Sequence, residues 1–137
     1  MSTNTNTTIS IIGSGGMAAA IGALAVKAGH TVEFMTRDPA KASTLAATLG
    51  GGATTGIFGA VPKGDLVILA VPHAAVLEVV THYGERLAGK ILIDITNPYV
   101  GGKVDADINT TERIQELAPG ARVTKQIPGR PVSFPYA

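Results

Sequence analysis

The sequence predicts a single α/β domain built on a doubly wound parallel sheet, and three observations lead to this fold class. A short apolar strand at residues 10–12 runs into a glycine-rich turn, and a helix is predicted over residues 19–29. Strands and helices alternate along the rest of the chain, as in parallel sheets. The continuous apolar run at residues 65–71 is typical of a strand covered by helices on both faces. We expect strand order 3-2-1-4-5-6, with the ligand at the carboxyl ends of the strands.

The turn at residues 13–18 has the spacing Gly-x-Gly-x-x-Ala, which is a dinucleotide-binding fingerprint. Gly13 permits the tight turn, Gly15 lets the backbone approach a pyrophosphate, and Ala18 lets the helix and the strand pack closely. The free amide groups at the helix start would then bind the anion. Chance matches are common in a chain with 17 glycines, so the assignment depends on the segment that follows.

That segment is a second predicted strand, residues 31–35, which ends at Thr36 and Arg37, about 20 positions past the glycines. At this place an acidic residue binds the ribose 2′-hydroxyl of NAD, whereas an arginine pairs with the 2′-phosphate of NADP. Arg37 supplies a forked guanidinium, and Lys41 adds a point charge one helical turn later. The pattern predicts a preference for NADP over NAD.

Plainer explanations of the same residues stay open. Asp38 is a good helix N-cap and Pro39 suits the first helical position, so neither residue needs a ligand. Arg37 and Lys41 are also acceptable as solvated surface charges. The glycine turn at the expected distance is what favours the phosphate interpretation.

Composition excludes several other function classes. The chain has 137 residues, of which 45% are apolar, enough for one domain with a core. A net charge of +1 and 4% aromatic residues argue against a nucleic-acid surface. The absence of cysteine removes disulfides and thiolate metal sites, and no histidine pair has metal-ligand spacing. The polar start lacks the features of a signal peptide, and no apolar run is long enough to span a membrane, so we expect a cytoplasmic protein.

The remaining elements continue the alternation. They are a helix at 41–49, a short strand at 53–55, a connection at 56–64 with room for a helical turn, a helix at 73–83, a strand at 90–94, a helix at 105–117 and a sixth strand at 121–124. We therefore expect a polar tail over residues 1–8, one nucleotide-binding domain over 9–125, and an irregular tail over 126–137, which contains three prolines.

Two loops fall at the carboxyl ends of the fourth and fifth strands, beside the crevice where the second half of a dinucleotide would lie. The first carries Pro72 and His73, and the second carries Asn97. Helix initiation by Pro72 and ordinary turn chemistry at Asn97 are the alternatives to cofactor contact. Asp94, on a strand of Ile and Leu, is expected to be a hydrogen-bonded structural carboxylate rather than a general acid.

These motifs together resemble the NADP oxidoreductases that depend on the deazaflavin coenzyme F-420, over about residues 7–125. The resemblance rests on the segments 12–18, 36–41, 69–72 and 94–98. It implies that residues 14–17 surround the pyrophosphate, that Thr36, Arg37 and Lys41 hold the 2′-phosphate, and that residues 70–73 line the nicotinamide side. In this family hydride passes directly between nicotinamide and deazaflavin, so no catalytic triad is expected.

The predicted cofactor-binding residues are Gly13, Ser14, Gly15, Gly16, Met17, Ala18, Thr36, Arg37, Lys41, Ala70, Val71, Pro72, His73 and Asn97. No catalytic residue is predicted, because no Lys, Tyr or His is placed as a proton donor. No metal ligand is predicted, because the chain has no cysteine and no histidine pair with metal-ligand spacing.

The sequence departs from the family pattern after residue 125. Family members continue there through helices that complete the deazaflavin pocket and a dimer contact, whereas residues 126–137 are proline-rich. The first hypothesis is an oxidoreductase that transfers hydride between NADP(H) and a deazaflavin or similar small acceptor. The second is a non-catalytic NADP-binding module or an inactive, shortened reductase. A dehydrogenase that acts on a small alcohol or imine is a further option. The homodimer that the resemblance implies, the acceptor and turnover stay open.

Overall fold

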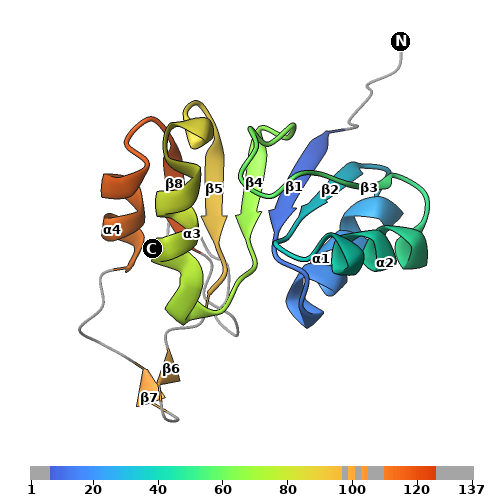
Figure 1. The fold of residues 1–137 in the computed structure, drawn as a ribbon, viewed down its shortest axis with the longest axis horizontal. Helices are drawn as coiled ribbons and strands as arrows, with labels where there is room; N and C mark the ends of the chain where they lie inside the picture. Colours follow the sequence, from blue (N-terminus) through green and yellow to red (C-terminus); the bar gives the residue numbers. More distant parts are fainter. Residues whose placement is uncertain (1–6, 97–98, 101–102, 105–109, 126–137) are drawn as a thin grey trace.

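The computed structural model describes residues 7–96, 99–100, 103–104 and 110–125. Its main sheet has six parallel strands in the order β3-β2-β1-β4-β5-β8, which confirms the predicted fold class and strand order (Figure 1). The strands are β1 (Thr8–Ile12), β2 (Thr31–Met35), β3 (Ala53–Thr55), β4 (Leu66–Leu69), β5 (Ile91–Asp94) and β8 (Arg122–Lys125).

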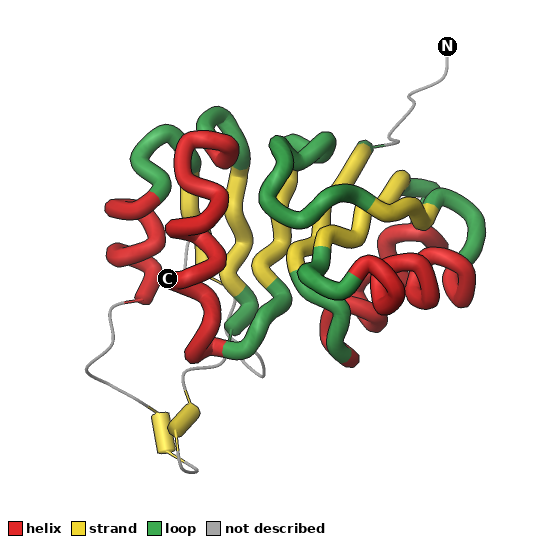
Figure 2. Tube along the Cα trace, in the orientation of Figure 1, coloured by secondary structure: helices red, strands yellow, loops and turns green. Residues whose placement is uncertain are grey.

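The helices cover both faces of this sheet (Figure 2). They are α1 (Gly16–Lys27), α2 (Pro39–Leu49), α3 (Val76–Tyr83) and α4 (Thr110–Leu117), with short 3-10 turns η1 (His73–Ala75) and η2 (Gly84–Leu87) on either side of α3. Successive strand residues contribute to different cores: Ile11 packs with α1 and α2, whereas Ile12 packs with α3 and α4. This is the alternation that a strand buried on both faces produces.

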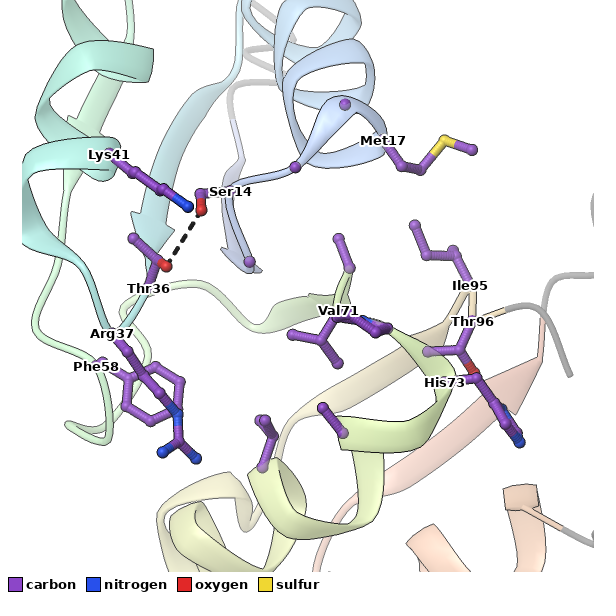
Figure 3. A pocket seen from close by; sticks show the side chains of 17 residues that line it. Ser14, Met17, Thr36, Arg37, Lys41, Phe58, Val71, His73, Ile95 and Thr96 are labelled. Atoms are coloured by element: carbon purple, nitrogen blue, oxygen red, sulfur yellow. Dashed lines mark hydrogen bonds between the residues drawn. The ribbon is translucent and has the colours of Figure 1, made fainter. Parts of the chain in front are cut away.

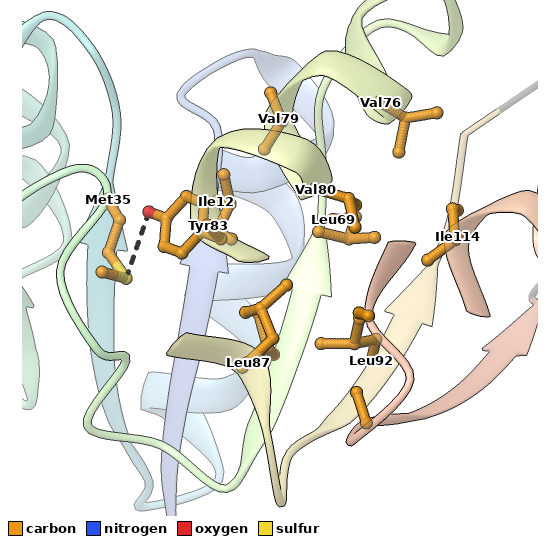
Figure 4. Packing of buried hydrophobic residues seen from close by; sticks show 13 residues of the cluster. Ile12, Met35, Leu69, Val76, Val79, Val80, Tyr83, Leu87, Leu92 and Ile114 are labelled. Atoms are coloured by element: carbon orange, nitrogen blue, oxygen red, sulfur yellow. Dashed lines mark hydrogen bonds between the residues drawn. The ribbon is translucent and has the colours of Figure 1, made fainter. Parts of the chain in front are cut away.

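The core beneath α3 and α4 is the larger of the two. In Figure 4, Val79, Val80 and Tyr83 of α3 lie over the strand residues Ile12 and Leu69. Burial raises the pKa of the Tyr83 hydroxyl, because the ionised phenolate would lose its hydration. The hydroxyl lies 3.8 Å from the sulfur of Met35.

Local chemistry explains where the first helices begin. The Asp38 carboxylate accepts a 3.0 Å hydrogen bond from the amide of Ala40, and Pro39 opens α2, so the predicted N-cap is confirmed. Helix α1 begins at Gly16, three residues before the predicted start, with Gly15 as its N-cap. A Cβ at Gly22 of α1 would come within 2.5 Å of the Phe34 ring, so this small residue lets α1 approach β2.

A buried carboxylate joins three segments at the middle of the sheet. Glu33 of β2 accepts hydrogen bonds from the Ser10 hydroxyl of β1, at 2.7 Å, and from the amide of Lys63, at 3.0 Å. The amide of Gly64 donates in turn to the Ser10 oxygen, at 2.9 Å. Since Ser10 and Glu33 are partners in the β1–β2 register, this network fixes both the strand pairing and the loop that leads into β4.

The structure also differs from the sequence predictions. Two short antiparallel strands, β6 (Tyr99–Val100) and β7 (Lys103–Val104), form a separate pair that was not predicted. The helix predicted over 105–117 is described from Thr110, because residues 105–109 lie outside the described residues. Among the described helices, none combines the length and the apolar character needed to cross a membrane.

Candidate functional site

A cleft of about 720 Å³ opens at the carboxyl ends of β1, β2, β4 and β5 (Figure 3). It lies where the strand order reverses, at the adjacent strands β1 and β4. It is lined by Gly13, Ser14, Gly15, Gly16, Met17, Thr36, Arg37, Lys41, Phe58, Ala70, Val71, Pro72, His73, Ala75, Val79, Ile95 and Thr96. The structure thus brings together every predicted site residue within the described part of the chain except Ala18.

The glycine loop combines one packed position with two open ones. Gly13 has φ +129°, and a Cβ there would lie 2.1 Å from the carbonyl oxygen of Ala70, so only glycine fits between the loops after β1 and β4. A Cβ at Gly15 or Gly16 would meet no atom within 4 Å. The backbone at the start of α1 is therefore accessible from the cleft, where the first amides of a helix have no intrahelical acceptor.

One end of the cleft is polar and positively charged. The Thr36 hydroxyl donates a 3.3 Å hydrogen bond to the Ser14 oxygen, which joins the end of β2 to the glycine loop. Figure 3 shows the Lys41 ammonium beside these two hydroxyls. In this arrangement the Lys41 ammonium and the Ser14 hydroxyl can donate to an anion, because the Thr36 proton is already donated to Ser14.

Arg37 lines the same end of the cleft, but its side chain points away from Lys41 (Figure 3). Its guanidinium carbon lies 4.9 Å from the centre of the Phe58 ring, and its Nη2 donates to the Glu78 carboxylate of α3 at 2.5 Å. Arg37 therefore reaches from the end of β2 to a helix of the other half of the sheet. The two cations that the sequence places together are separated in this structure.

The opposite end of the cleft is mostly apolar. Met17, which is 52% exposed, lies with Val71 and Ile95 around this end (Figure 3). Behind them Asp94 is buried and accepts hydrogen bonds from the amide of Thr96, at 2.8 Å, and from its hydroxyl, at 2.6 Å. Asp94 is thus the hydrogen-bonded carboxylate that the sequence predicts.

The Thr96 hydroxyl also fixes the nearby histidine. Nδ1 of His73 lies 3.4 Å from the Thr96 oxygen. Because that hydroxyl donates its proton to the Asp94 carboxylate, it is an acceptor toward His73, and Nδ1 of His73 carries a hydrogen in this arrangement. His73 thus lines the cleft through η1, while its ring contacts the loop after β5.

A family model described as NADP oxidoreductase coenzyme F420-dependent matches residues 8–98, more than half of the chain. The chain belongs to this family. The match runs from β1 past the end of β5, so it contains all the predicted cofactor-binding residues. It ends before β8, whereas the resemblance seen in the sequence extends to about residue 125.

The chain is also similar to a curated dehydrogenase and to solved structures. A glycerol-3-phosphate dehydrogenase [NAD(P)+] of Pseudomonas fluorescens (strain SBW25) is 28% identical over 128 residues, which is 84% of this chain and 37% of the relative. A hypothetical protein from Sinorhizobium meliloti superposes with a TM-score of 0.73 at 28% identity, covering 90% of this chain and 62% of that one.

An imine reductase from Aspergillus terreus, solved in complex with NADPH4 and dibenz[c,e]azepine, superposes with a TM-score of 0.69 at 27% identity. The superposition covers 90% of this chain and 42% of the imine reductase. The chain thus spans only part of the length of the relatives it matches. At the general level it is a member of a family of NAD(P)-dependent oxidoreductases.

One predicted site residue in the described part of this family member does not line the cleft, and another lies outside that part. Ala18 is fully buried in the core between α1 and the sheet, where it has the packing role that the fingerprint gives it. Asn97 lies outside the described residues.

The sequence analysis missed five lining residues: Phe58, Ala75, Val79, Ile95 and Thr96. Thr96 and Ile95 belong to the loop after β5, whose position was predicted, so their place in the chain was a usable signal. Val79 follows Ala75 by one helical turn, so both residues lie on the side of η1 and α3 that faces the cleft. Phe58 lies in the irregular connection after β3, where no pattern indicates contact with the cleft.

Proposed function

We propose that the chain binds NADP(H) and transfers hydride between its nicotinamide and a deazaflavin such as coenzyme F-420, or a similar small acceptor. One observation carries this proposal: a single continuous cleft joins the polar end at Thr36 and Lys41 to the apolar end at Val71 and Ile95, across the point where the strand order reverses. Membership of the F420-dependent NADP oxidoreductase family supports the same assignment.

The glycine loop fits a pyrophosphate. The open space above Gly15 and Gly16 leaves room for the diphosphate against the first turn of α1. No acidic side chain lies in that turn, so nothing there repels an anion. In this role the backbone binds the ligand, and Ser14 lies at the side of the loop that faces Thr36.

The polar end fits a 2′-phosphate. Lys41 supplies a positive charge and the Ser14 hydroxyl supplies a short-range donor, while Arg37 is the stronger donor once it turns toward the cleft. The 2′-hydroxyl of NAD would favour a carboxylate at the tip of β2, and the residues there that line the described cleft include none.

The apolar end fits the nicotinamide ring. When bound there, NADPH supplies the hydride that the acceptor takes up together with one proton from water, leaving NADP+. The residues of the chain position the ring: Val71 and Ile95 offer apolar contact, and Met17 covers the entrance. His73 is the nearest titratable side chain among the described lining residues of this end, and its hydrogen bond to Thr96 holds it in place.

A non-catalytic NADP-binding module is the second candidate function. The chain spans 37% of the length of the dehydrogenase and 42% of that of the imine reductase, so the activities of those whole proteins are not carried over to it. The observation that favours the module is the lining of the described cleft, whose glycine loop, polar end and apolar end are all groups that the nucleotide itself would use. The two candidates share the binding step and differ in hydride transfer.

A single experiment separates these candidates. The purified chain is titrated with NADPH and with NADH by calorimetry, and oxidised deazaflavin is then added to the NADPH complex while its absorbance is followed. Tighter binding of NADPH with loss of deazaflavin absorbance supports the oxidoreductase. Binding without transfer supports the module, and binding of neither nucleotide contradicts both. Gel filtration of the same sample measures whether the chain forms the homodimer that the family implies.

A further inference from the structure

Arg37, Phe58 and Glu78 form a cluster that closes across one end of the cleft. The guanidinium of Arg37 lies over the Phe58 ring and bonds to the Glu78 carboxylate. These residues come from the end of β2, the loop after β3, and α3, respectively. The cluster is thus a contact between the two halves of the sheet, made by side chains alone.

The position of Glu78 on its helix leaves it available for this contact. The buried face of α3 consists of Val76, Val79, Val80 and Tyr83, and Glu78 lies on the exposed side of the same helix. A negative charge in the first turn also stabilises α3, because it interacts with the free amides at the start of the helix. This interaction is a structural role for Glu78 that does not require Arg37.

The ion pair is exposed and therefore easily exchanged. The side chains of Arg37 and Glu78 are 57% and 70% exposed. Water and salt weaken such a pair, whereas a phosphate dianion offers Arg37 more charge and more acceptor oxygens than one carboxylate does. A phosphate that uses Arg37 has to release it from Glu78, or else share it with a carboxylate of the same sign.

We propose that Glu78 is a specificity-determining residue, which competes with the 2′-phosphate of NADPH for Arg37 and so limits the preference for NADPH over NADH. This inference rests on the proposed NADP(H) site. NADH has no 2′-phosphate, so its binding leaves the Arg37–Glu78 pair intact. Lys41, which the pair does not involve, keeps its place beside Ser14 and Thr36 in either case.

The variant Glu78→Gln tests this role, because glutamine keeps the size of the side chain and removes its charge. The ligands are NADPH and NADH, together with adenosine 2′,5′-bisphosphate and adenosine 5′-monophosphate, which differ by the 2′-phosphate alone. We expect the Kd of both 2′-phosphorylated ligands to fall about threefold to tenfold, equivalent to about 0.6–1.4 kcal/mol. The Kd values of NADH and the monophosphate should stay within about twofold, since one exposed charge has a small effect on them.

Two further variants make the result specific. Glu85→Gln changes the net charge by the same amount at an exposed residue of η2 that does not line the described cleft. It should shift all four ligands alike and only slightly. In an Arg37→Ala background, Glu78→Gln should not tighten the binding of the 2′-phosphorylated ligands, because the guanidinium for which Glu78 and the phosphate compete is missing.

Several results would overturn the inference. Equal weakening of all four ligands by Glu78→Gln would mean that Glu78 only holds Arg37 against Phe58. Equally tighter binding of all four ligands, or tighter binding that Glu85→Gln reproduces, would mean a general charge effect. Unchanged Kd values would mean that Glu78 has no influence on nucleotide binding. If the unaltered chain bound none of the four ligands, the NADP(H) site and this inference would fail together. If the unaltered chain bound NADPH but Glu78→Gln left the ratio of the NADPH and NADH Kd values unchanged, this inference alone would fail.

Discussion

The two ends of the cleft are built in different ways. At the end formed by β1, α1 and β2, binding groups are backbone amides, two hydroxyls and two cations, close together in sequence around Gly15 and Thr36. At the end formed by the loops after β4 and β5, together with Met17 of α1, the lining is mainly apolar and comes from residues as far apart as Met17 and Ile95. The first end offers charge and hydrogen-bonding groups, and the second offers an apolar surface.

The difference teaches which part of a nucleotide site is visible in a sequence. A pyrophosphate requires particular residue types at fixed spacing, because only glycine leaves the backbone open and only a few side chains bind phosphate. A flat ring requires an apolar surface, which many residues supply from many positions. Recognition of charge therefore leaves a motif, whereas recognition of shape does not.

The largest expected effect separates ligand contact from packing within the glycine loop. Gly15→Val places a side chain in the open space above the loop, so binding of NADPH and NADH should weaken roughly tenfold to hundredfold, as a steric clash of about 1–3 kcal/mol implies. Calorimetric titration of both nucleotides measures the effect. Unchanged affinities would mean that the loop does not contact the nucleotide.

Gly13→Ala is the matched control. Its Cβ would meet the Ala70 carbonyl, and the backbone there has a positive φ. The variant should therefore have a lower free energy of unfolding, whereas Gly15→Val should lower affinity alone. Thermal unfolding without ligand distinguishes the two variants, since Gly15→Val should unfold close to the temperature of the unaltered chain.

The next effect tests whether the polar end distinguishes the two nucleotides. Arg37→Ala should weaken NADPH binding by about 1.5–3 kcal/mol, the contribution of a hydrogen bond to a charged group, and leave NADH nearly unchanged. Arg86→Ala, at an exposed residue of η2 outside the described cleft lining, controls for the loss of a positive charge. Equal weakening of both nucleotides would contradict the assignment of Arg37 to the 2′-phosphate.

The next effect is on stability rather than on affinity, and it tests the rigidity of the apolar end. Thr96→Val removes the hydroxyl that donates to Asp94 and accepts from His73, so we expect a loss of about 1–3 kcal/mol in the free energy of unfolding. Denaturant unfolding measures it. Thr81→Val is the control, because its hydroxyl bonds only to a helix carbonyl on an exposed face among the contacts described, and its loss should cost much less. Equal losses in the two variants would contradict a special role for the Asp94 contact.

The smallest effect concerns the core beneath the cleft. Burial raises the pKa of Tyr83, so above pH about 10 the unfolded chain loses this proton while the folded chain still holds it. The free energy of unfolding should therefore fall as pH rises from about 10 to the raised pKa of Tyr83. Tyr83→Phe should reduce this slope and change stability at neutral pH by less than about 1 kcal/mol. An identical slope in the variant would rule out Tyr83 as its source.

Much of the fold follows from local chemistry, and the sequence contains that chemistry. The N-cap Asp38 with Pro39 and the apolar run of β4 each act within a few residues, and the structure confirms them. The direction of the Arg37 side chain depends on Glu78, 41 positions away, and on Phe58 in an irregular connection. Such contacts exist only once the chain has folded, so no periodicity or spacing indicates them.

The Glu33 network has a consequence for how this protein can change over generations. Its hydrogen bonds hold β1 and β2 in register at the middle of the strands and do not involve the tip of β2. Substitutions at Arg37 and Glu78 should therefore leave the β1–β2 pairing undisturbed. If the proposed site is correct, nucleotide preference can change in one or two substitutions, because the register of the strands is secured elsewhere.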